Sequence, residues 1–298
     1  IIKTGITYYY SSNFIDENNI YLFRENAILM KSSDGGQTWS EKKMPFTLLK
    51  SGYYKFFDLN NGIYVSLPDS SLLRTTDAGD YWEKLSLPST SLFGISYFLN
   101  KKIGFIIDDN KFIKTTDGGD SWTQTNNFPY TSIASMYFFN ENIGWFSSFS
   151  GLIYKTTDGG ENWEQQIVGS ISLIYYYKFF DENNGFIFGN GFLFKTTNGG
   201  ANWKKYYSGS SFDTYINYID FSPDEVLIGV GNNGIIKRTD NQGMTWIEKR
   251  NGTMRFLYGA YFFDKNNGWI VGNSSTLLKT TNAGETWEQK STDSLINL

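Results

Sequence analysis

Short apolar runs separated by polar turns follow one another along the whole chain. In the segment 134–166, apolar or aromatic runs at 134–139, 144–146 and 152–155 alternate with turns rich in Asn, Gly and Ser. Runs of this kind, rich in aromatic and β-branched residues and bounded by Gly, Asn, Asp or Ser, are typical of strands joined by tight turns. No apolar period of helical length lies between them. The pattern predicts an all-β chain built from meanders of four antiparallel strands.

Each predicted meander contains one box, Thr/Ser-x-Asp/Asn-x-Gly, which is followed after two residues by tryptophan. The box occurs seven times at a spacing of about 41 residues, and such a period over a whole chain indicates one repeated supersecondary unit. The Asp/Asn and Trp positions are Asp34 and Trp39, Asp77 and Trp82, Asp117 and Trp122, Asp158 and Trp163, Asn198 and Trp203, Asn241 and Trp246, and Asn282 and Trp287.

Seven four-stranded units predict a seven-bladed β-propeller, with the box between the third and fourth strands of each blade. The aromatic content of 18% fits, because large flat side chains fill the space between twisted sheets. No linker-like stretch interrupts the repeat, so we expect a single domain over residues 1–298. The expected blades span approximately residues 1–46, 47–88, 89–129, 130–169, 170–210, 211–253 and 254–298.

The boxes are interpreted as structural. An Asp or Asn side chain accepts hydrogen bonds from the backbone amides of its own turn, and the Gly two residues later adopts a positive φ without steric cost. Three boxes carry Asn198, Asn241 and Asn282 in place of Asp. This exchange preserves a turn cap but removes the charge that a general acid or a hard-cation site needs. The tryptophans are expected to anchor the hairpins in the apolar layer.

The boxes resemble the Asp-box, or BNR, repeat. The form Lys-Thr-Thr-Asp-Gly-Gly at 114–119 and 155–160, together with Asn-Gly-Trp/Phe strand starts, is similar to the photosystem II assembly factor family, the Ycf48/HCF136-like propellers. The resemblance covers the whole chain and implies boxes at the outer rim and a basic, arginine-rich surface toward the partner. Asp boxes also occur in sialidases, sortilin propellers and xyloglucan-cleaving enzymes, so the box indicates fold more than activity.

The amino-acid composition argues against several classes of partner and of catalytic or metal site. The 26 basic and 30 acidic residues are mixed along the chain and leave a net charge of -4, which argues against nucleic acid or an acidic membrane surface as a partner. The chain contains neither Cys nor His, which removes thiolate chemistry, the commonest metal ligand and any Ser-His-Asp triad. The apolar runs are too short for membrane insertion. We therefore expect no cofactor, no metal site and no catalytic residue.

A carbohydrate-binding or glycoside-hydrolase-like propeller is the alternative, because such activity needs only two facing carboxylates. The carboxylates expected at the end of the blades opposite the boxes are Glu25, Asp69, Asp108, Asp109 and Asp213. A sialidase is disfavoured, because Arg74 and Arg238 precede boxes as lysines do elsewhere, and too few of the five arginines remain for a substrate triad. Acidic turns at 16–19, 181–184 and 264–267 lack the spaced ligands of a calcium loop.

The irregular loops opposite the boxes are the predicted binding face. Aromatic side chains there suit a protein partner or sugar rings. Beside the carboxylates named above, the candidate residues are Phe128, Tyr130, Tyr206, Tyr207, Arg255 and Phe256. The seven Lys/Arg residues that precede the boxes, starting with Lys31, are expected to form a peripheral ring. The sequence thus favours a non-catalytic interaction or scaffold module with a protein partner or a larger extracellular assembly, at an extracytoplasmic location.

Overall fold

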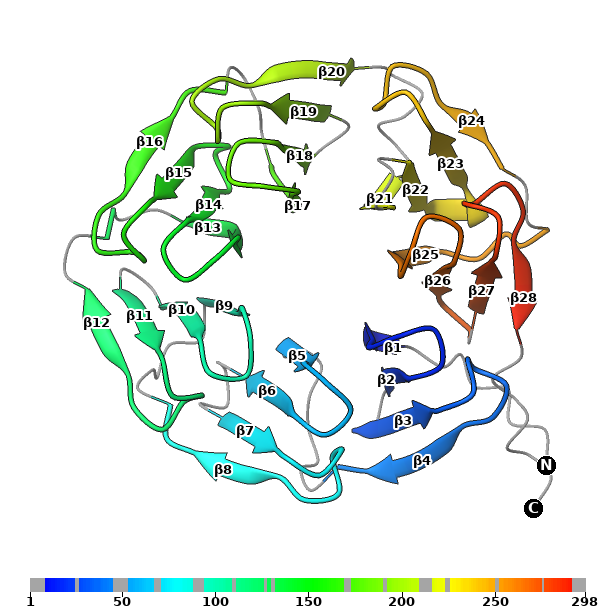
Figure 1. Cartoon of the computed structure of the whole chain (residues 1–298), viewed down its shortest axis with the longest axis horizontal. Coiled ribbons are helices and arrows are strands. Elements are labelled where there is room, and N and C mark those ends of the chain that lie inside the picture. Colours follow the sequence, from blue (N-terminus) through cyan, green and yellow to red (C-terminus); the bar gives the residue numbers. More distant parts are fainter. Residues whose placement is uncertain are drawn as a thin grey trace. The chain divides into compact units, whose positions relative to one another are not determined.

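A computed structural model gives seven four-stranded antiparallel sheets and a single short 3-10 turn in the part of the chain that it describes. The residues described are 9–24, 27–44, 53–66, 71–87, 94–108, 111–125, 128–129, 132–168, 173–189, 192–208, 216–222, 226–249, 252–274 and 276–290. Each sheet is a meander whose strands pair in chain order (Figure 1). The predicted fold class is confirmed: the chain has the all-β fold of a seven-bladed propeller, with four antiparallel strands in each blade.

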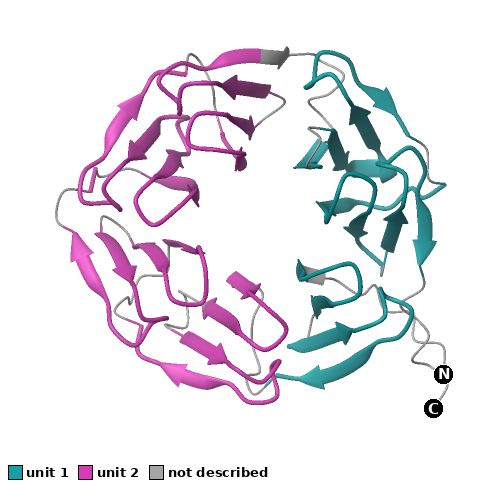
Figure 2. Cartoon of the chain, viewed as in Figure 1, with its two compact units in different colours: residues 1–51, 210–298 teal, residues 52–209 magenta. Residues whose placement is uncertain are grey.

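The chain divides into two compact units, which Figure 2 colours separately. Unit 1, residues 1–51 and 210–298, holds blades 1, 6 and 7. Blade 1 consists of β1 (Tyr9–Phe14), β2 (Ile20–Arg24), β3 (Ile28–Ser32) and β4 (Ser40–Lys43). Blade 6 consists of β21 (Ile216–Phe221), β22 (Leu227–Gly231), β23 (Ile236–Thr239) and β24 (Ile247–Glu248), with the 3-10 turn at Asn232–Gly234. Blade 7 consists of β25 (Leu257–Phe262), β26 (Gly268–Gly272), β27 (Thr276–Thr280) and β28 (Glu288–Lys290).

Unit 2, residues 52–209, holds blades 2 to 5. Blade 2 consists of β5 (Tyr53–Phe56), β6 (Gly62–Ser66), β7 (Ser71–Thr75) and β8 (Glu83–Leu85). Blade 3 consists of β9 (Gly94–Phe98), β10 (Gly104–Asp108), β11 (Lys111–Thr115) and β12 (Thr123–Thr125). Blade 4 consists of β13 (Ile133–Phe138), β14 (Gly144–Ser148), β15 (Ile153–Thr156) and β16 (Glu164–Gln166). Blade 5 consists of β17 (Tyr176–Phe179), β18 (Gly185–Gly189), β19 (Phe192–Thr196) and β20 (Lys204–Ser208).

The second and third strands carry the core. β10, β14, β18, β22 and β26 are buried along their whole length, whereas the fourth strands are mostly exposed. Buried side chains of consecutive blades within a unit form shared clusters, for example Phe105, Phe112, Phe138 and Phe146 of blades 3 and 4. Burial of both faces explains why these strands are continuous apolar runs rather than alternating ones.

A Phe–Gly contact fixes the first hairpin of most blades. The first strand ends at a phenylalanine, and the second strand of five blades begins with glycine, as in the pairs Phe98 with Gly104 and Phe138 with Gly144. A Cβ at Gly104 or Gly144 would overlap the phenylalanine ring opposite. Glycine therefore lets the ring lie flat across the neighbouring strand.

Every blade has two ends of different character. The turn from first to second strand and the box lie at one end, called here the box edge; the connections from second to third strand and from fourth strand to the next blade lie at the other, the loop edge. The boxes join the third and fourth strands, as predicted. The assignment of residues 1–298 to one domain stays a prediction.

Candidate functional site

The box is a closed hydrogen-bonded turn centred on a hydroxyl. In blade 3, Thr115 Oγ1 donates to Asp117 Oδ1 at 2.8 Å and accepts from the backbone N–H of Gly119 at 2.9 Å. Asp117 Oδ1 also accepts from the backbone N–H of Ser121 at 2.9 Å. Gly119 has a φ of +100°, a conformation that glycine adopts at little cost. The turn thus satisfies its own polar groups.

The same hydroxyl recurs in every box, and each is buried. These residues are Ser32, Thr75, Thr115, Thr156, Thr196, Thr239 and Thr280. Where the box carries an amide, the geometry is unchanged: Asn198 Oδ1 accepts from Thr196 Oγ1 at 3.0 Å and from the Asn202 N–H at 2.9 Å. The amide oxygen therefore replaces the carboxylate oxygen without loss of a bond, which explains why Asp and Asn alternate at this position.

The box tryptophans pack inward beside their turns. Trp39, Trp122 and Trp163 donate their indole N–H to the carbonyl of a box glycine at 3.1, 3.2 and 3.1 Å. Trp39, Trp82 and Trp287 are buried, and the remaining box tryptophans are half-buried. In these three boxes the indole thus ties the turn to the apolar layer of its blade.

Two of the box carboxylates, Asp34 and Asp117, are held as anions. The hydroxyl of Thr38, its N–H and further donors lower the pKa of Asp34 to about 2. The hydroxyl and N–H of Ser121 lower the pKa of Asp117 in the same way. Hydrogen bonds to the charged form favour ionisation, so these groups are poorly suited to act as general acids.

The acidic turns of the box edge form hydrogen bonds within themselves and with the neighbouring box. Asp16 Oδ1 accepts from the backbone N–H of Asn18 and Asn19 at 2.9 and 2.8 Å. The Gly35 N–H of the box donates to Asn18 O at 2.9 Å. Within the described ranges, no group of three or more acidic side chains could hold a metal ion. The turn carboxylates are thus used in Asx turns that brace the box.

The cations that precede the boxes pair with two kinds of residue on the neighbouring strand of their own blade. In five blades a lysine pairs across strands with an aromatic residue and its Nζ lies 5.1–5.7 Å from the ring centroid: Tyr21 with Lys31, Phe105 with Lys114, Trp145 with Lys155, Phe186 with Lys195, and Trp269 with Lys279. In the other two blades an arginine pairs with isoleucine: Ile63 with Arg74 and Ile228 with Arg238. We call the two arrangements Lys junctions and Arg junctions.

Both kinds of cation reach the next blade within a unit. Lys114 Nζ donates to Glu141 O of blade 4 at 3.2 Å. Arg74 contacts Asp120 of the blade 3 box at 3.0 Å and Glu83 of its own blade at 2.8 Å. Arg238 donates to Ala283 O at 2.9 Å and contacts Glu285 at 3.1 Å in blade 7. At these junctions the predicted peripheral ring of cations is occupied in holding blade to blade.

The predicted binding-face residues are only partly placed. Glu25, Asp69, Asp109, Tyr130 and Asp213 lie outside the described residues, and Tyr206 and Tyr207 are described only as backbone of β20. Two others are buried. Phe128 packs with Phe112 and Phe146, which removes it from the surface, because its ring closes the core beneath the loop. Asp108 is 5% exposed, and its Oδ1 has no hydrogen-bond partner among the described residues.

Exposed apolar side chains do occur at the loop edge. Arg255 and Phe256 are exposed there, and Met254 beside them is 80% exposed; their role in binding stays a prediction. In unit 2 the exposed side chains include Phe149, Leu152, Ile167 and Tyr175, with Ile167 83% exposed. The sequence analysis did not predict this second group. The sequence gives one indication of it: Ile167 is an aliphatic residue directly after a polar fourth strand.

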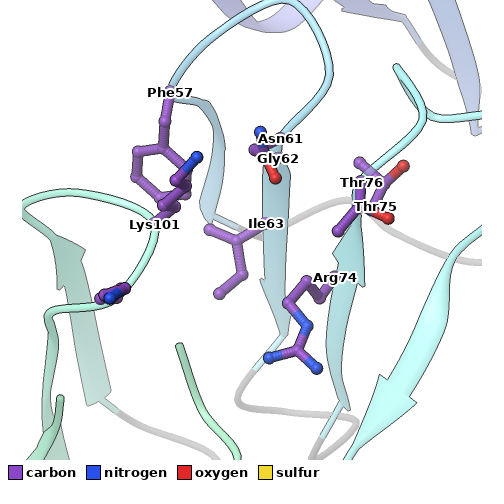
Figure 3. Close-up of a pocket in the computed structure, with 9 residues that line it drawn as sticks. Phe57, Asn61, Gly62, Ile63, Arg74, Thr75, Thr76 and Lys101 are labelled. Atoms are coloured by element: carbon purple, nitrogen blue, oxygen red, sulfur yellow. The ribbon is translucent and has the colours of Figure 1, made fainter. Parts of the chain in front are cut away.

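A pocket of about 180 Å³ lies at the box edge of unit 2, at the junction of blades 2 and 3 (Figure 3). Its walls include Phe57, Asn61, Ile63 and Arg74 of blade 2 and Lys101 and Lys102 of blade 3. Figure 3 shows Ile63 between Phe57 and Arg74. The pocket therefore coincides with an Arg junction and was not foreseen from the sequence.

A family model described as Photosynthesis system II assembly factor YCF48 matches residues 6–97 and 165–254, together more than half of the chain. The chain belongs to this family. Among solved structures, "YCF48 bound to D1 peptide" matches with a TM-score of 0.63 and 21% identity over 83% of this chain and 88% of that one. YCF48 from Cyanidioschyzon merolae matches with a TM-score of 0.71 and 17% identity over 93% and 96%.

Enzymes share the fold as well. The GH74 xyloglucanase from Xanthomonas campestris matches with a TM-score of 0.71 and 12% identity, over 94% of this chain and 54% of the enzyme. At such identities the structural matches establish the fold alone. No curated protein sequence matches the chain.

This member of the YCF48 family places its described arginines differently from the arginine-rich surface that the resemblance implied. Arg74 and Arg238 lie in blade junctions, and Arg24 pairs with Glu41 at 2.6 Å. Arg255 is exposed at the loop edge, and Arg250 lies outside the described residues. Among the described residues no helix has the length and apolarity to cross a membrane. The candidate surface for a partner is therefore the apolar loop edge rather than an arginine cluster.

Proposed function

We propose that the chain is a non-catalytic interaction module that holds a segment of a partner protein at the loop edge of its blades, outside the cytoplasm. The observation that carries the proposal is the contrast between the two edges. Box-edge polar groups are engaged in turns and junctions. Among the described residues, exposed large apolar side chains are more numerous at the loop edge (Phe149, Leu152, Ile167, Tyr175, Met254 and Phe256) than at the box edge (Leu59, Tyr81 and Met244). Exposed large apolar and aromatic side chains are characteristic of protein-binding surfaces.

Family membership supports a protein partner. One solved relative is YCF48 bound to a D1 peptide, and we propose that this chain likewise binds a peptide segment. The extracytoplasmic location is part of the proposal and follows from the resemblance; fractionation of the native cell, with the chain expected outside the cytoplasmic fraction, tests it separately.

Site-specific photocrosslinking in the native host tests the partner and the surface together. A photoreactive phenylalanine analogue replaces Met254 or Tyr175 at the loop edge. Matched controls carry it at Tyr81 or Met244, which are 70% and 63% exposed in the boxes. We expect one dominant protein adduct from the loop-edge positions and none from the controls. Adducts from the box positions alone would contradict the choice of surface, and no protein adduct from any position would contradict the function.

A further inference from the structure

Blade 2 lacks a ring that its counterparts place between blades. In blade 4, Trp145 follows the strand-opening glycine and stacks on Phe179 of blade 5 with centroids 3.8 Å apart and planes at 12°. In blade 3, Phe105 stacks on Phe138 of blade 4 at 3.6 Å and 10°. The corresponding residue of blade 2 is Ile63, which also follows the opening glycine of its strand. An isoleucine side chain is shorter than an indole or a benzyl group and cannot stack.

The space beside Ile63 is open. The pocket of about 180 Å³ there exceeds a cavity of about 150 Å³ that is known to hold benzene. Phe98 of blade 3, the counterpart of Phe138 and Phe179, meets Tyr53 and Phe57 of blade 2 only at centroid distances of 6.3 and 6.4 Å. Phe98 packs with the buried Ile63 and with Tyr53 and does not line the pocket, so the opening lies beside the Ile63–Phe98 contact, next to Phe57 and Lys101.

The charges around this opening are also reversed. The first hairpin turn of blades 4 and 5 carries Glu141 and Glu182, and the Gly159 and Gly199 N–H groups of the boxes bond the residue after each glutamate. In blade 3 the same bond runs from Gly118 to Lys102 O, so Lys101 occupies the glutamate position. Lys101 and Lys102 join Arg74 in the pocket wall. Lys101 Nζ has one carboxylate partner, Asp58, at 3.5 Å, and both residues are exposed.

We propose that the pocket between blades 2 and 3 is a binding site for an aromatic ring that carries a negative charge. The ring lies in the opening beside Ile63 and against Phe57, next to the position where other blades carry an aromatic side chain of their own. Lys101 and Lys102 supply cation–π contact and charge attraction at the mouth, whereas Arg74 in the wall is already paired with Glu83 and Asp120. The proposal concerns the box edge and is independent of the proposed partner surface at the loop edge.

The test is a titration of the full chain, followed by NMR or calorimetry. The probes are indole-3-propionate, its neutral amide and cyclohexanepropionate, and a blocked Glu-Trp dipeptide forms a separate arm for a ring supplied by a peptide. We expect saturable binding at about millimolar concentration, as is usual for fragments of this size, with weaker binding of the neutral amide and weakest binding of the alicyclic acid. Binding by the dipeptide but not by the free acid supports the site and identifies a peptide as the source of the ring. Failure of both aromatic acids to bind overturns the proposal.

Two variants localise the site. Ile63→Phe places an aromatic side chain beside the pocket, as five other blades have at this position, so it should abolish binding without lowering the melting temperature. Lys102→Glu should weaken binding of the aromatic acid at least several-fold, whereas Lys84→Glu, the same charge change on exposed β8 outside the pocket wall, should not. If Ile63→Phe fails to fold, the lysine pair alone decides. Unchanged affinity in Lys102→Glu, or equal losses in the two lysine variants, would contradict the proposal.

Discussion

The junction of blades 4 and 5 and the junction of blades 2 and 3 use the same positions in different ways. At the first, the fully buried Trp145 stacks on Phe179, and Lys155 lies 5.3 Å above the indole. At the second, Ile63 leaves a pocket, and Arg74 turns to two carboxylates, Glu83 and Asp120. One junction is closed by a ring and a cation above it, the other by an ion-pair network.

The difference shows that the residue types at the two positions vary together: a lysine accompanies an aromatic residue, and an arginine accompanies an isoleucine. A lysine ammonium is compact and lies over an aromatic face, whereas the arginine fork bonds two carboxylates at once. Arg238 repeats the second solution with Ile228, Glu285 and Ala283 O. A repeat protein can thus change two contacting residues at a blade junction together while it keeps the same fold.

The largest effect is expected when the ring is removed from the Lys junction. Trp145→Ala deletes a fully buried indole and its stacking partner contact, so the free energy of unfolding should fall by about 3–5 kcal/mol. Trp145→Ile, which imitates blade 2, should recover part of this loss. Denaturant unfolding of the two variants measures both effects. Equal stability of Trp145→Ala and the parent chain would mean that the junction is not closed by the ring.

The next effect concerns the box hydroxyl, which both junctions share. Thr156→Val keeps the shape of the side chain but leaves the buried Gly160 N–H without its 2.9 Å acceptor. A loss of about 1–3 kcal/mol is expected from an unsatisfied buried donor. Thr157→Val, one residue along and exposed, is the matched control and should change little. If the two variants lose equal stability in thermal melts, the hydroxyl is not the centre of the turn.

Sequence reasoning found the fold because the Trp of each box recurs at a regular spacing and Asp or Asn marks each turn. It included the Thr or Ser of each box in the motif but assigned no role to its hydroxyl, because the sequence does not show that this side chain is buried and bonds both the Asp and a glycine N–H. It missed the pocket because Ile63 and Arg74 are distant in sequence and meet only through strand register. The coincidence of Ile with Arg in blades 2 and 6 was a visible signal. Phe128 was placed on the surface because an aromatic in a loop gives no sign of which way it points.

A smaller effect is expected at the Arg junction. Arg74→Lys replaces a guanidinium that contacts Glu83 and Asp120, both about half-exposed. Exposed ion pairs contribute at most about 1 kcal/mol each and are screened by salt. The variant should therefore melt a few degrees lower at low salt and nearly with the parent chain at high salt. A loss that persists at high salt would point to packing of the arginine stem instead.

The smallest expected effect is a difference in stability between Asp boxes and Asn boxes, and it is expected only at low pH. The pKa of Asp34 is lowered to about 2 in the folded chain, first by the Thr38 hydroxyl, from an ordinary value of 3.8. Because the folded-state pKa is depressed, the stabilisation is present above about pH 4 and is lost as the pH falls toward 2. Asp34→Asn imitates the Asn198 box and keeps the acceptor oxygen, so it should leave stability at neutral pH within about 0.5 kcal/mol of the parent chain. Melting temperatures at about pH 5 and pH 2.5 should then differ less in the variant than in the parent chain, because the amide does not titrate. An equal acid sensitivity in both chains would show that Asp34 gains no stability from ionisation, and that the two box types differ in sequence alone.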